Sequence, residues 1–524
     1  MKITYKSIVA LLAIAAAAIT AGCIKDDIPF PHIQANILEI SAVGQSQAAR
    51  IDTVTRNVTF WFPEETDIQN VKIDNYRLTP DAVVQDSAFS RPLNLSQPLQ
   101  VNVFLYYDYQ WTLTAIQNIE RYINVSGQVG TATIDVPAHR VLLTVVDTED
   151  LARIHVEKIK LGAEGSVMTP DLNGKTVDLN APLEVTVTTH GRSEKWTIYA
   201  ETTEALVTTA RVDAWTNVAW VYGQGIEGAQ FGVEYRIKGD QQWIPVPSDW
   251  ITVNGGSFFA RLVHLSPQTT YEARAVAGQD YGSAVEFTTG ISVQPPNMSF
   301  DSWWLDGKVW CPWAEGSTPY WSTGNKGATT LGNSNTVPTD DTVTGTGQAA
   351  MLQTKFVGIG MIGKLAAGNI FVGDYVRTEG TNGVLAFGRP FTERPTKLRG
   401  YYKYTTAPIS SVISAFDYMK GQPDTCIVWC ALIDQPTPFE IRTNPANRQL
   451  FDPDGSYVIA YGKMEMGQDV EQYTPFEFEL QYNATDRVPK YLLITASASK
   501  YGDYFTGGNG AVLWLDELQL EYDY

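Results

Sequence analysis

Residues 497–524 read SASKYGDYFTGGNGAVLWLDELQLEYDY, an aromatic and glycine-rich loop that runs into one alternating strand. Side chains two residues apart in a strand point to the same face of a sheet. This alternation places Asp516 on one face with Trp514, Leu518 and Leu520. A carboxylate among apolar neighbours must be paired or bound to a cation. The stretch therefore predicts a closing β-strand with a polar site at Asp516.

The composition of the 524-residue chain is typical of a secreted all-β protein. Apolar residues make up 44% and charged residues only 18%, and 42 Gly and 27 Pro interrupt the sequence. This length accommodates three or four domains of ordinary size. The net charge of −19 would repel a phosphate backbone, which argues against nucleic acid as a partner. A neutral glycan meets no such repulsion.

The first residues predict export and a membrane anchor. Lys2 and Lys6 precede an apolar run of about a dozen residues, which is shorter than the ~20 residues of a spanning helix and suits a signal peptide over residues 1–22. The box before Cys23 resembles a lipoprotein cleavage site, although Thr20 stands where Leu is usual. Cys23 would then carry the lipid.

The linker over residues 23–32 contains Ile24-Lys25-Asp26-Asp27, which resembles the export tag of lipoproteins that face outward from a Gram-negative outer membrane. An ordinary secretory signal with a chance cysteine is the alternative.

Two copies of one pattern follow, spaced by about 85 residues. LSQPLQVNV at residues 95–103 is echoed by LNAPLEVTV at residues 179–187, and each copy leads to a strand with a tryptophan, Trp111 or Trp196. Short alternating strands at this repeat length predict tandem β-sandwiches. The motif resembles immunoglobulin-like modules of glycan-associated surface lipoproteins, here over residues 33–118 and 119–202. These modules serve as spacers or, alternatively, bind a ligand themselves.

Residues 203–290 form a third predicted module. Its LSPQTTYEARAVA segment at residues 265–277 resembles the fibronectin type III pattern, in which the hydroxyl of a tyrosine, here Tyr271, caps a corner of the sandwich. The resemblance implies a scaffold without chemistry. A linker with Pro295 and Pro296 marks the boundary to the last domain, residues 296–524.

Indoles are dense at the start of this last domain. Trp303, Trp310, Tyr320 and Trp321 lie among Gly, Ser and Pro residues within about twenty positions. Tryptophan on loops at the end of a sandwich usually marks a contact surface, and sugar rings stack on flat aromatic rings. The alternative is that several of these rings fill the base of the sandwich.

Several separated motifs of the last domain match one family in order. They are FDSW (300–303), YWSTGN (320–325), GNIFVG (368–373), RPTKLRGYYKY (394–404), SKYGDYFTGG (499–508) and LDEL (515–518). Together they resemble the putative carbohydrate metabolism domain family of gut-type bacterial lipoproteins. The resemblance implies a β jelly roll with a candidate sugar pocket. It does not imply a demonstrated reaction.

The distribution of histidine limits the chemistry. All five histidines precede residue 296, so a Ser-His-Asp triad or a His-ligated metal within the last domain is excluded. A glycosidase-like carboxylate pair is one alternative, with Glu477 and Glu479 about 6.6 Å apart on one strand face. Asp503 is the other catalytic candidate, as an acid or as a residue that orients sugar hydroxyls.

Binding without turnover is the function that we favour from the sequence. The predicted ligand contacts are Trp303, Trp310, Tyr320, Trp321, Asn325, Arg389, Tyr402, Asp503 and Tyr504. Asp301 and Asp516 are candidate ligands of a structural Ca²⁺, and a salt bridge would explain Asp516 equally well. No other cofactor is predicted.

The distance between Cys426 and Cys430 is about 13 Å in a strand, too far for a disulfide, which leaves Cys311 free to pair with either.

The sequence thus predicts a lipid-anchored outer-membrane protein, displayed outward, whose all-β modules carry a C-terminal jelly roll. The jelly roll would bind a polysaccharide or glycoconjugate for a glycan-uptake and metabolism system. The rival hypotheses are a glycoside hydrolase and a protein-binding adhesin or structural surface protein.

Overall fold

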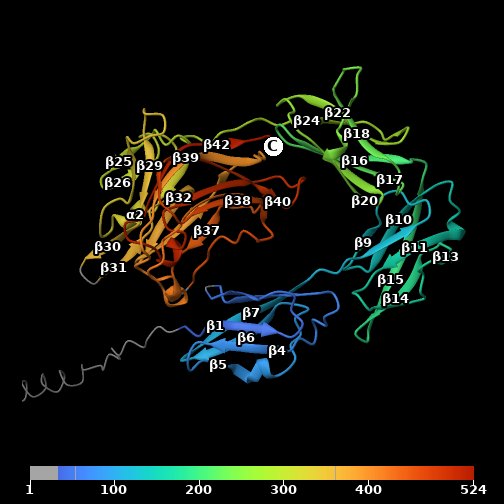
Figure 1. Cartoon of the computed structure of the whole chain (residues 1–524), viewed down its shortest axis with the longest axis horizontal. Helices are drawn as coiled ribbons and strands as arrows, with labels where there is room; N and C mark the ends of the chain where they lie inside the picture. Colours follow the sequence, from blue (N-terminus) through green and yellow to red (C-terminus); the bar gives the residue numbers. More distant parts are fainter. Residues whose placement is uncertain (1–33, 54, 360–361, 446) are drawn as a thin grey trace, which may run out of the picture. The chain divides into compact units, whose positions relative to one another are not determined.

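The computed structural model describes residues 34–53, 55–359, 362–445 and 447–524, and its regular secondary structure is almost entirely β-strand (Figure 1). The predicted signal peptide, Cys23 and the export tag lie outside the described residues. The chain divides into two compact units, one ending at residue 118 and one beginning at residue 119. Among the described residues, no helix has the length and apolarity needed to cross a membrane.

The first unit contains two sheets with the orders β1-β4 and β2-β3-β7-β6-β5. Its elements are β1 (Ile37–Ala42), β2 (Arg50–Asp52), β3 (Asn57–Phe62), β4 (Ile73–Leu78), β5 (Val83–Val84), the 3-10 helix η1 (Gln85–Ser90), β6 (Leu99–Leu105) and β7 (Tyr107–Gln117). Strand β3 pairs with β7 in parallel, and the fully buried Trp111 donates from its indole N–H to the carbonyl of Ala35.

The next module repeats this pattern. Its elements are β8 (Tyr122–Val125), β9 (Thr133–Asp135), β10 (Arg140–Val146), η2 (Leu151–Arg153), β11 (Ile154–Lys160), β12 (Val167–Thr169), β13 (Thr176–Val177), β14 (Leu183–Thr189) and β15 (Arg192–Thr203). Strands β10 and β15 pair in parallel as β3 and β7 do, and Trp196 is fully buried like Trp111. The two sequence copies therefore have the same strand pairing and the same buried indole.

The third module is a sandwich with sheet orders β16-β17-β21-β20 and β19-β18-β22-β23, and β24 also pairs with β22. Its elements are β16 (Val207–Ala214), β17 (Ala219–Gly225), β18 (Phe231–Ile237), β19 (Ile244–Pro245), η3 (Ser248–Trp250), β20 (Ile251–Asn254), β21 (Ser257–Leu262), β22 (Thr270–Ala277), β23 (Asp280–Tyr281) and β24 (Val285–Thr288). The hydroxyl of Tyr271 accepts a hydrogen bond from the Ser266 backbone N–H at 3.0 Å, which is a contact across a tyrosine corner.

The C-terminal domain places a nine-stranded sheet, β37-β33-β32-β41-β36-β38-β40 with β27 and β34 attached, against a five-stranded sheet, β28-β29-β42-β35-β39. Its first elements are the hairpin β25 (Trp304–Asp306) and β26 (Val309–Cys311), β27 (Trp321–Thr323), the short helix α2 (Asn325–Ala328), β28 (Thr336–Thr339), β29 (Ala349–Gln353), the hairpin β30 (Lys355–Ile359) and β31 (Ile362–Ala366), β32 (Asn369–Glu379), β33 (Asn382–Phe387) and β34 (Arg389–Pro390). The remaining elements are β35 (Lys397–Thr405), η4 (Ser414–Met419), β36 (Cys426–Ile433), β37 (Phe439–Arg442), β38 (Val458–Met466), β39 (Val470–Glu479), β40 (Gln481–Tyr482), β41 (Tyr491–Ser497), η5 (Gly502–Tyr504) and β42 (Val512–Glu521). Two antiparallel sheets that face each other across one core confirm the predicted all-β sandwich architecture.

The nine-stranded sheet is apolar on both faces. In β36, Val428 and Cys430 point into the core between the two sheets, whereas Trp429 and Ala431 belong to a second apolar cluster on the opposite face. Alternation along a strand explains this division. The near-continuous apolar sequence CIVWCALI of β36 is thus covered on both sides.

A β-bulge in the last strand corrects the face that the sequence predicted for Asp516. Asp516 is opposite Tyr401 and Gln519 is opposite Arg399, so β42 carries one extra residue here, and Glu517 has a φ of 49°. The extra residue switches the parity of the strand. As a result, Leu518 and Leu520 join Leu513 and Leu515 in the core, and Asp516 lies on the other face with Trp514.

The three cysteines of the described residues, Cys311, Cys426 and Cys430, are free and buried. Cys311 therefore pairs with neither of the two candidates.

Candidate functional site

A cavity of about 200 Å³ opens on the face of the nine-stranded sheet that points away from the core between the two sheets. Strands β31, β32, β33, β36 and β41 and the loop after β41 contribute to its wall. Its side chains include Lys364, Asn369, Phe371, Tyr375, Thr378, Thr381, Leu385, Phe387, Ile427, Trp429, Thr443, Thr495, Ser497, Lys500, Asp503 and Phe505.

Aromatic and aliphatic groups form one side of the cavity. Phe371 and Phe387 pack with ring centroids 4.7 Å apart, and Phe387 and Trp429 with centroids 6.0 Å apart. The hydroxyl of Tyr375 is 2.7 Å from that of Thr378, and burial raises the pKa of this phenol. Because these residues alternate with core residues along β32, β33 and β36, the sheet itself sets their positions.

The loop after β41 brings Asp503 and Phe505 to the cavity, and a buried carboxylate holds this loop. Asp424 is 2% exposed, and its Oδ2 accepts from the Ser499 hydroxyl at 2.5 Å and from the Gly508 N–H at 2.6 Å. The Thr354 hydroxyl lies 2.6 Å from that of Ser499. Asp424 thus fixes both ends of the segment 499–508, and burial raises its pKa although these donors act against the rise.

Asp503 is half-buried in the cavity wall. Burial raises the pKa of its carboxyl group, and the positive charge of Arg448 partly offsets that rise. This is the one predicted catalytic candidate that the structure places in the cavity.

Lys364 brings a positive charge to the same cavity. Its Nζ donates to Oδ1 of Asn382 at 2.9 Å and lies 4.1 Å from the centroid of the Phe505 ring. Burial, with a contribution from Arg448, lowers the pKa of this ammonium group. Lys500, by contrast, forms a 2.7 Å ion pair with Glu465.

The structure places the predicted aromatic contacts mainly in the core. Trp321 is 1% and Tyr402 is 4% exposed in the core between the sheets, and Trp303 and Tyr320 pack against it half-buried. Burial raises the pKa of Tyr320 to about 12. Trp310 lies half-buried on the β25–β26 hairpin. None of these five residues lines the cavity, so the alternative that the rings fill the sandwich fits the structure.

The predicted polar contacts also have internal partners. Asn325 is fully buried and exchanges four hydrogen bonds with the backbone of Trp310, Asn335 and Thr336. Arg389 forms a bidentate pair with Asp374, with both distances 2.7 Å. Tyr504 packs edge-on against Phe416 beside the cavity. These side chains stabilise loops and do not reach the cavity wall.

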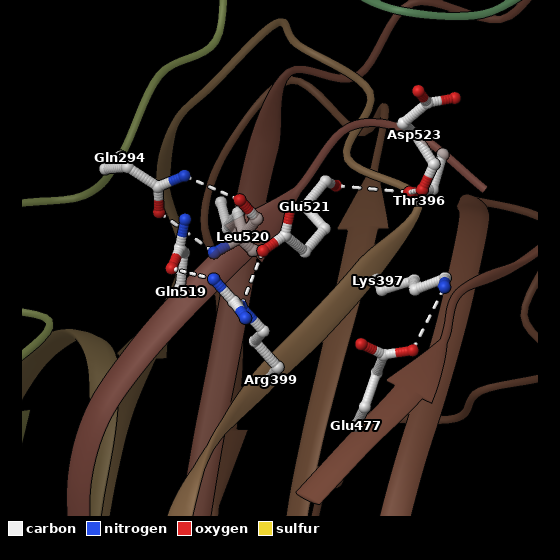
Figure 2. A network of polar contacts seen from close by, with 9 residues as sticks. All are labelled: Gln294, Thr396, Lys397, Arg399, Glu477, Gln519, Leu520, Glu521 and Asp523. Atoms are coloured by element: carbon white, nitrogen blue, oxygen red, sulfur yellow. Dashed lines mark hydrogen bonds and ion pairs between the residues drawn. The ribbon is translucent and has the colours of Figure 1, made fainter. Parts of the chain in front are cut away.

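Glu477 and Glu479 are exposed on β39, in the five-stranded sheet. Figure 2 shows Glu477 paired with Lys397, at a distance of 3.0 Å. The neighbouring contacts of Arg399 with Gln519 and Glu521 continue this row of paired side chains along the same sheet. This carboxylate pair and the cavity belong to different sheets, and we assign the pair to a solvated sheet face.

The predicted calcium ligands are held by other donors. Oδ2 of Asp516 accepts from the Val343 N–H at 2.8 Å, and Oδ1 of Asp301 accepts from the Gln348 N–H at 2.8 Å. No group of three or more metal-ligating side chains occurs in the part of the chain that the structure describes. Ca²⁺ binding by this pair stays a prediction.

Sequence reasoning missed most of the cavity wall, including Lys364, Phe371, Tyr375 and Trp429. It also missed Asp424, which holds the loop that carries Asp503. The signal that could have revealed the wall is the absence of a polar face in strands such as CIVWCALI (426–433), since such a strand must be covered on both sides.

No curated protein matches this chain. A structure described as a putative glycoside hydrolase from Bacteroides thetaiotaomicron VPI-5482 is 17% identical, over 78% of this chain and 98% of that chain, with a TM-score of 0.31. Another putative glycoside hydrolase, from Bacteroides vulgatus ATCC 8482, is 22% identical over 42% of this chain and 94% of that chain, with a TM-score of 0.33.

A family model matches the domain that contains the cavity. The match covers residues 299–521, and the family is described as the putative carbohydrate metabolism domain. The cavity residues and Asp424 all lie within these bounds. The resemblance predicted from the sequence motifs is therefore confirmed, and the C-terminal domain of this chain is a putative carbohydrate metabolism domain.

Proposed function

We propose that the C-terminal domain binds a glycan in the cavity on the nine-stranded sheet. The observation that carries this proposal is the combination of an aromatic wall, Phe371, Tyr375, Phe387 and Trp429, with hydrogen-bonding and charged groups at Asn369, Lys364 and Asp503. Apolar surfaces with a few placed polar groups are typical of small-molecule sites. A pyranose ring presents both an apolar C–H face and hydroxyl groups, so it suits such a wall.

The cavity has room for only one part of a glycan. At about 200 Å³ it is smaller than the roughly 300–1,000 Å³ of sites for drug-sized ligands. We therefore propose that the cavity receives a terminal or branching sugar residue and that the rest of the glycan stays in solvent.

Binding is favoured over hydrolysis by the number of carboxylates. Among the described wall residues, Asp503 is the one Asp or Glu, whereas retaining and inverting glycosidases generally use two carboxyl groups. The raised pKa of Asp503 is the observation that keeps a glycoside hydrolase as the second candidate, because a general acid needs a raised pKa.

The proposal includes a place in the cell. We propose that Cys23 is lipidated and that the chain is displayed on the outer membrane, where it supports glycan uptake and metabolism. The support is the sequence of residues 1–27. Metabolic labelling with a fatty acid should mark the chain and not a Cys23→Ala variant, and protease added to intact cells should digest it.

A glycan array with the full chain tests the ligand, with and without a chelator, followed by reducing-end assays on every hit. Thr381→Trp places a large ring at the exposed turn on the cavity wall and should abolish binding. Thr437→Trp makes the same change at an exposed site off the wall and should bind normally. Hits that both variants retain, or an array without hits, would contradict a glycan site in this cavity. Release of reducing ends that Asp503→Asn abolishes would favour the hydrolase.

A further inference from the structure

We propose, building on the glycan-binding function, that the cavity selects an anionic sugar residue, with the ammonium group of Lys364 as the counter-ion of its carboxylate or sulfate group. Lys364 extends from β31 into the cavity wall, where the aromatic ring of Phe505 lies beside its Nζ. The proposal identifies a ligand class for the cavity and a residue that discriminates it from neutral sugars.

The charge of Lys364 has no counter-ion among the residues that the structure describes. The described contacts of its Nζ are the amide oxygen of Asn382 at 2.9 Å and the ring of Phe505 at 4.1 Å. No carboxylate of the described residues lies within ion-pair distance. A half-buried charge without a partner is costly, because burial disfavours the charged form. An anionic ligand would supply the missing partner.

Lys500, the other lysine of the described cavity wall, differs from Lys364 because it has an internal counter-ion. Lys500 also lines the cavity, but its Nζ is 2.7 Å from Glu465, and Glu465 also pairs with Lys463 at 2.7 Å. The charge of Lys500 is thus already balanced within the protein. The two lysines therefore have different roles, and of the lysines in the described cavity wall Lys364 is the one whose charge is left for a ligand.

Two other charged residues, Arg448 and Asp503, act on a ligand bound near Lys364. Arg448 adds a second positive charge that acts on both Lys364 and Asp503. Asp503 is the opposing negative charge in the wall, and its position would repel an anionic ligand while it is ionised. Burial favours its protonated form, which reduces this repulsion.

Removal of the Lys364 charge and removal of the Asp503 charge should have opposite effects on binding. Removing the Lys364 charge should weaken binding of an acidic sugar, and removing the Asp503 charge should strengthen that binding at pH values at which Asp503 is ionised. Binding of acidic sugars should also weaken with added salt and as the pH rises through the pKa of Lys364. Among the described residues, the other titratable or charged groups of this region are Tyr375, Asp503, Lys500, Glu465 and Arg448.

The test uses the full chain and matched pairs of oligosaccharides. Uronate-terminated, sulfated and neutral oligomers with the same linkage are titrated against the wild type, Lys364→Met, Lys364→Arg and Asp503→Asn, with Tm recorded for each variant. Lys420→Met removes the same charge from an exposed site off the wall and serves as the control.

We expect Lys364→Met to lose about ten-fold or more of its affinity for the acidic ligand, as a charged hydrogen bond of this kind provides. Lys364→Arg should retain most of the affinity, and Lys420→Met should match the wild type. Asp503→Asn should match the wild type while the Asp503 carboxyl group is protonated and should gain affinity at higher pH, where that group is ionised. The carboxylate and sulfate arms identify which anion is bound. Neutral oligomers that bind as well as acidic ones, and that Thr381→Trp excludes, would overturn the anion preference and leave the glycan site standing. An array without any hits would overturn both.

Discussion

The buried carboxyl group of Asp516 should make the C-terminal domain less stable as the pH rises from about 4 to about 7. Asp516 is 2% exposed, and burial raises its pKa from an ordinary 3.8 to about 6. Between these two values the folded state holds a proton that the unfolded state has lost, so stability falls with increasing pH. One pH unit corresponds to about 1.4 kcal/mol, so the full effect is about 3 kcal/mol.

The Asp516→Asn substitution isolates this contribution. The amide keeps one oxygen acceptor for the Val343 N–H and cannot ionise. Between pH 4 and pH 7, we therefore expect the wild type to lose about 3 kcal/mol of stability relative to the Asp516→Asn variant. Asp340→Asn makes the same charge change at an exposed residue and controls for net charge.

Hydrogen exchange of peptides from β42, corrected for the intrinsic pH dependence of exchange, reports the opening free energy of this domain alone. This matters because a chain of several domains does not unfold in two states. A wild type and an Asp516→Asn variant with equal pH slopes would refute the reasoning, and so would a slope of the opposite sign.

Three further predictions concern the cavity wall and its support. The hydroxyl of Thr495 is buried without a hydrogen-bond partner among the described residues, so Thr495→Val should leave Tm unchanged or raise it. Thr354→Val removes a 2.6 Å contact with Ser499 and should cost about 1 kcal/mol of stability. Equal losses of Tm in the two variants would contradict this reasoning. Asp424→Ala leaves the donors at Ser499, Gly508 and Thr425 without their acceptor and should destabilise the domain by about 3 kcal/mol or more. Peptides covering residues 499–508 should also exchange hydrogen faster in this variant. Exchange protection of these peptides at the wild-type level would exclude a positioning role for Asp424. Glu477→Gln should change stability by less than about 1 kcal/mol, since its pairing with Lys397 is exposed, and should leave glycan affinity as it is; a glycan affinity or turnover that falls would return β39 to the list of candidate sites.

The modules were predictable because their signals are local. The spacing of Trp111 and Trp196 after matching motifs marks two equivalent strands, and both indoles are fully buried. The Tyr271 corner likewise depends on a contact only five residues away, at Ser266. Such short-range patterns survive in the sequence because each module must cover its own core.

The site was less predictable, because a sequence shows the type of a side chain and not the face it occupies. Trp303 and Trp321 were predicted at a glycan surface, yet they belong to the core or pack on it. Asp503 was found from its loop, but the loop is anchored by Asp424, which lies 75 residues before Ser499 in the chain. One extra residue in β42 was enough to move Leu518 and Leu520 to the face opposite Asp516.

By itself, the sequence determined the all-β class, the repeated modules and the family of the last domain, because alternation, turn residues and motif order are properties of neighbouring residues. Only the tertiary structure decided which rings are core and which line a cavity, and that Lys364 and Asp503 share one wall. The physical reason is that antiparallel pairing joins strands distant in the chain, so the neighbours of a side chain, and with them its burial and charge, are fixed by the register of the sheet.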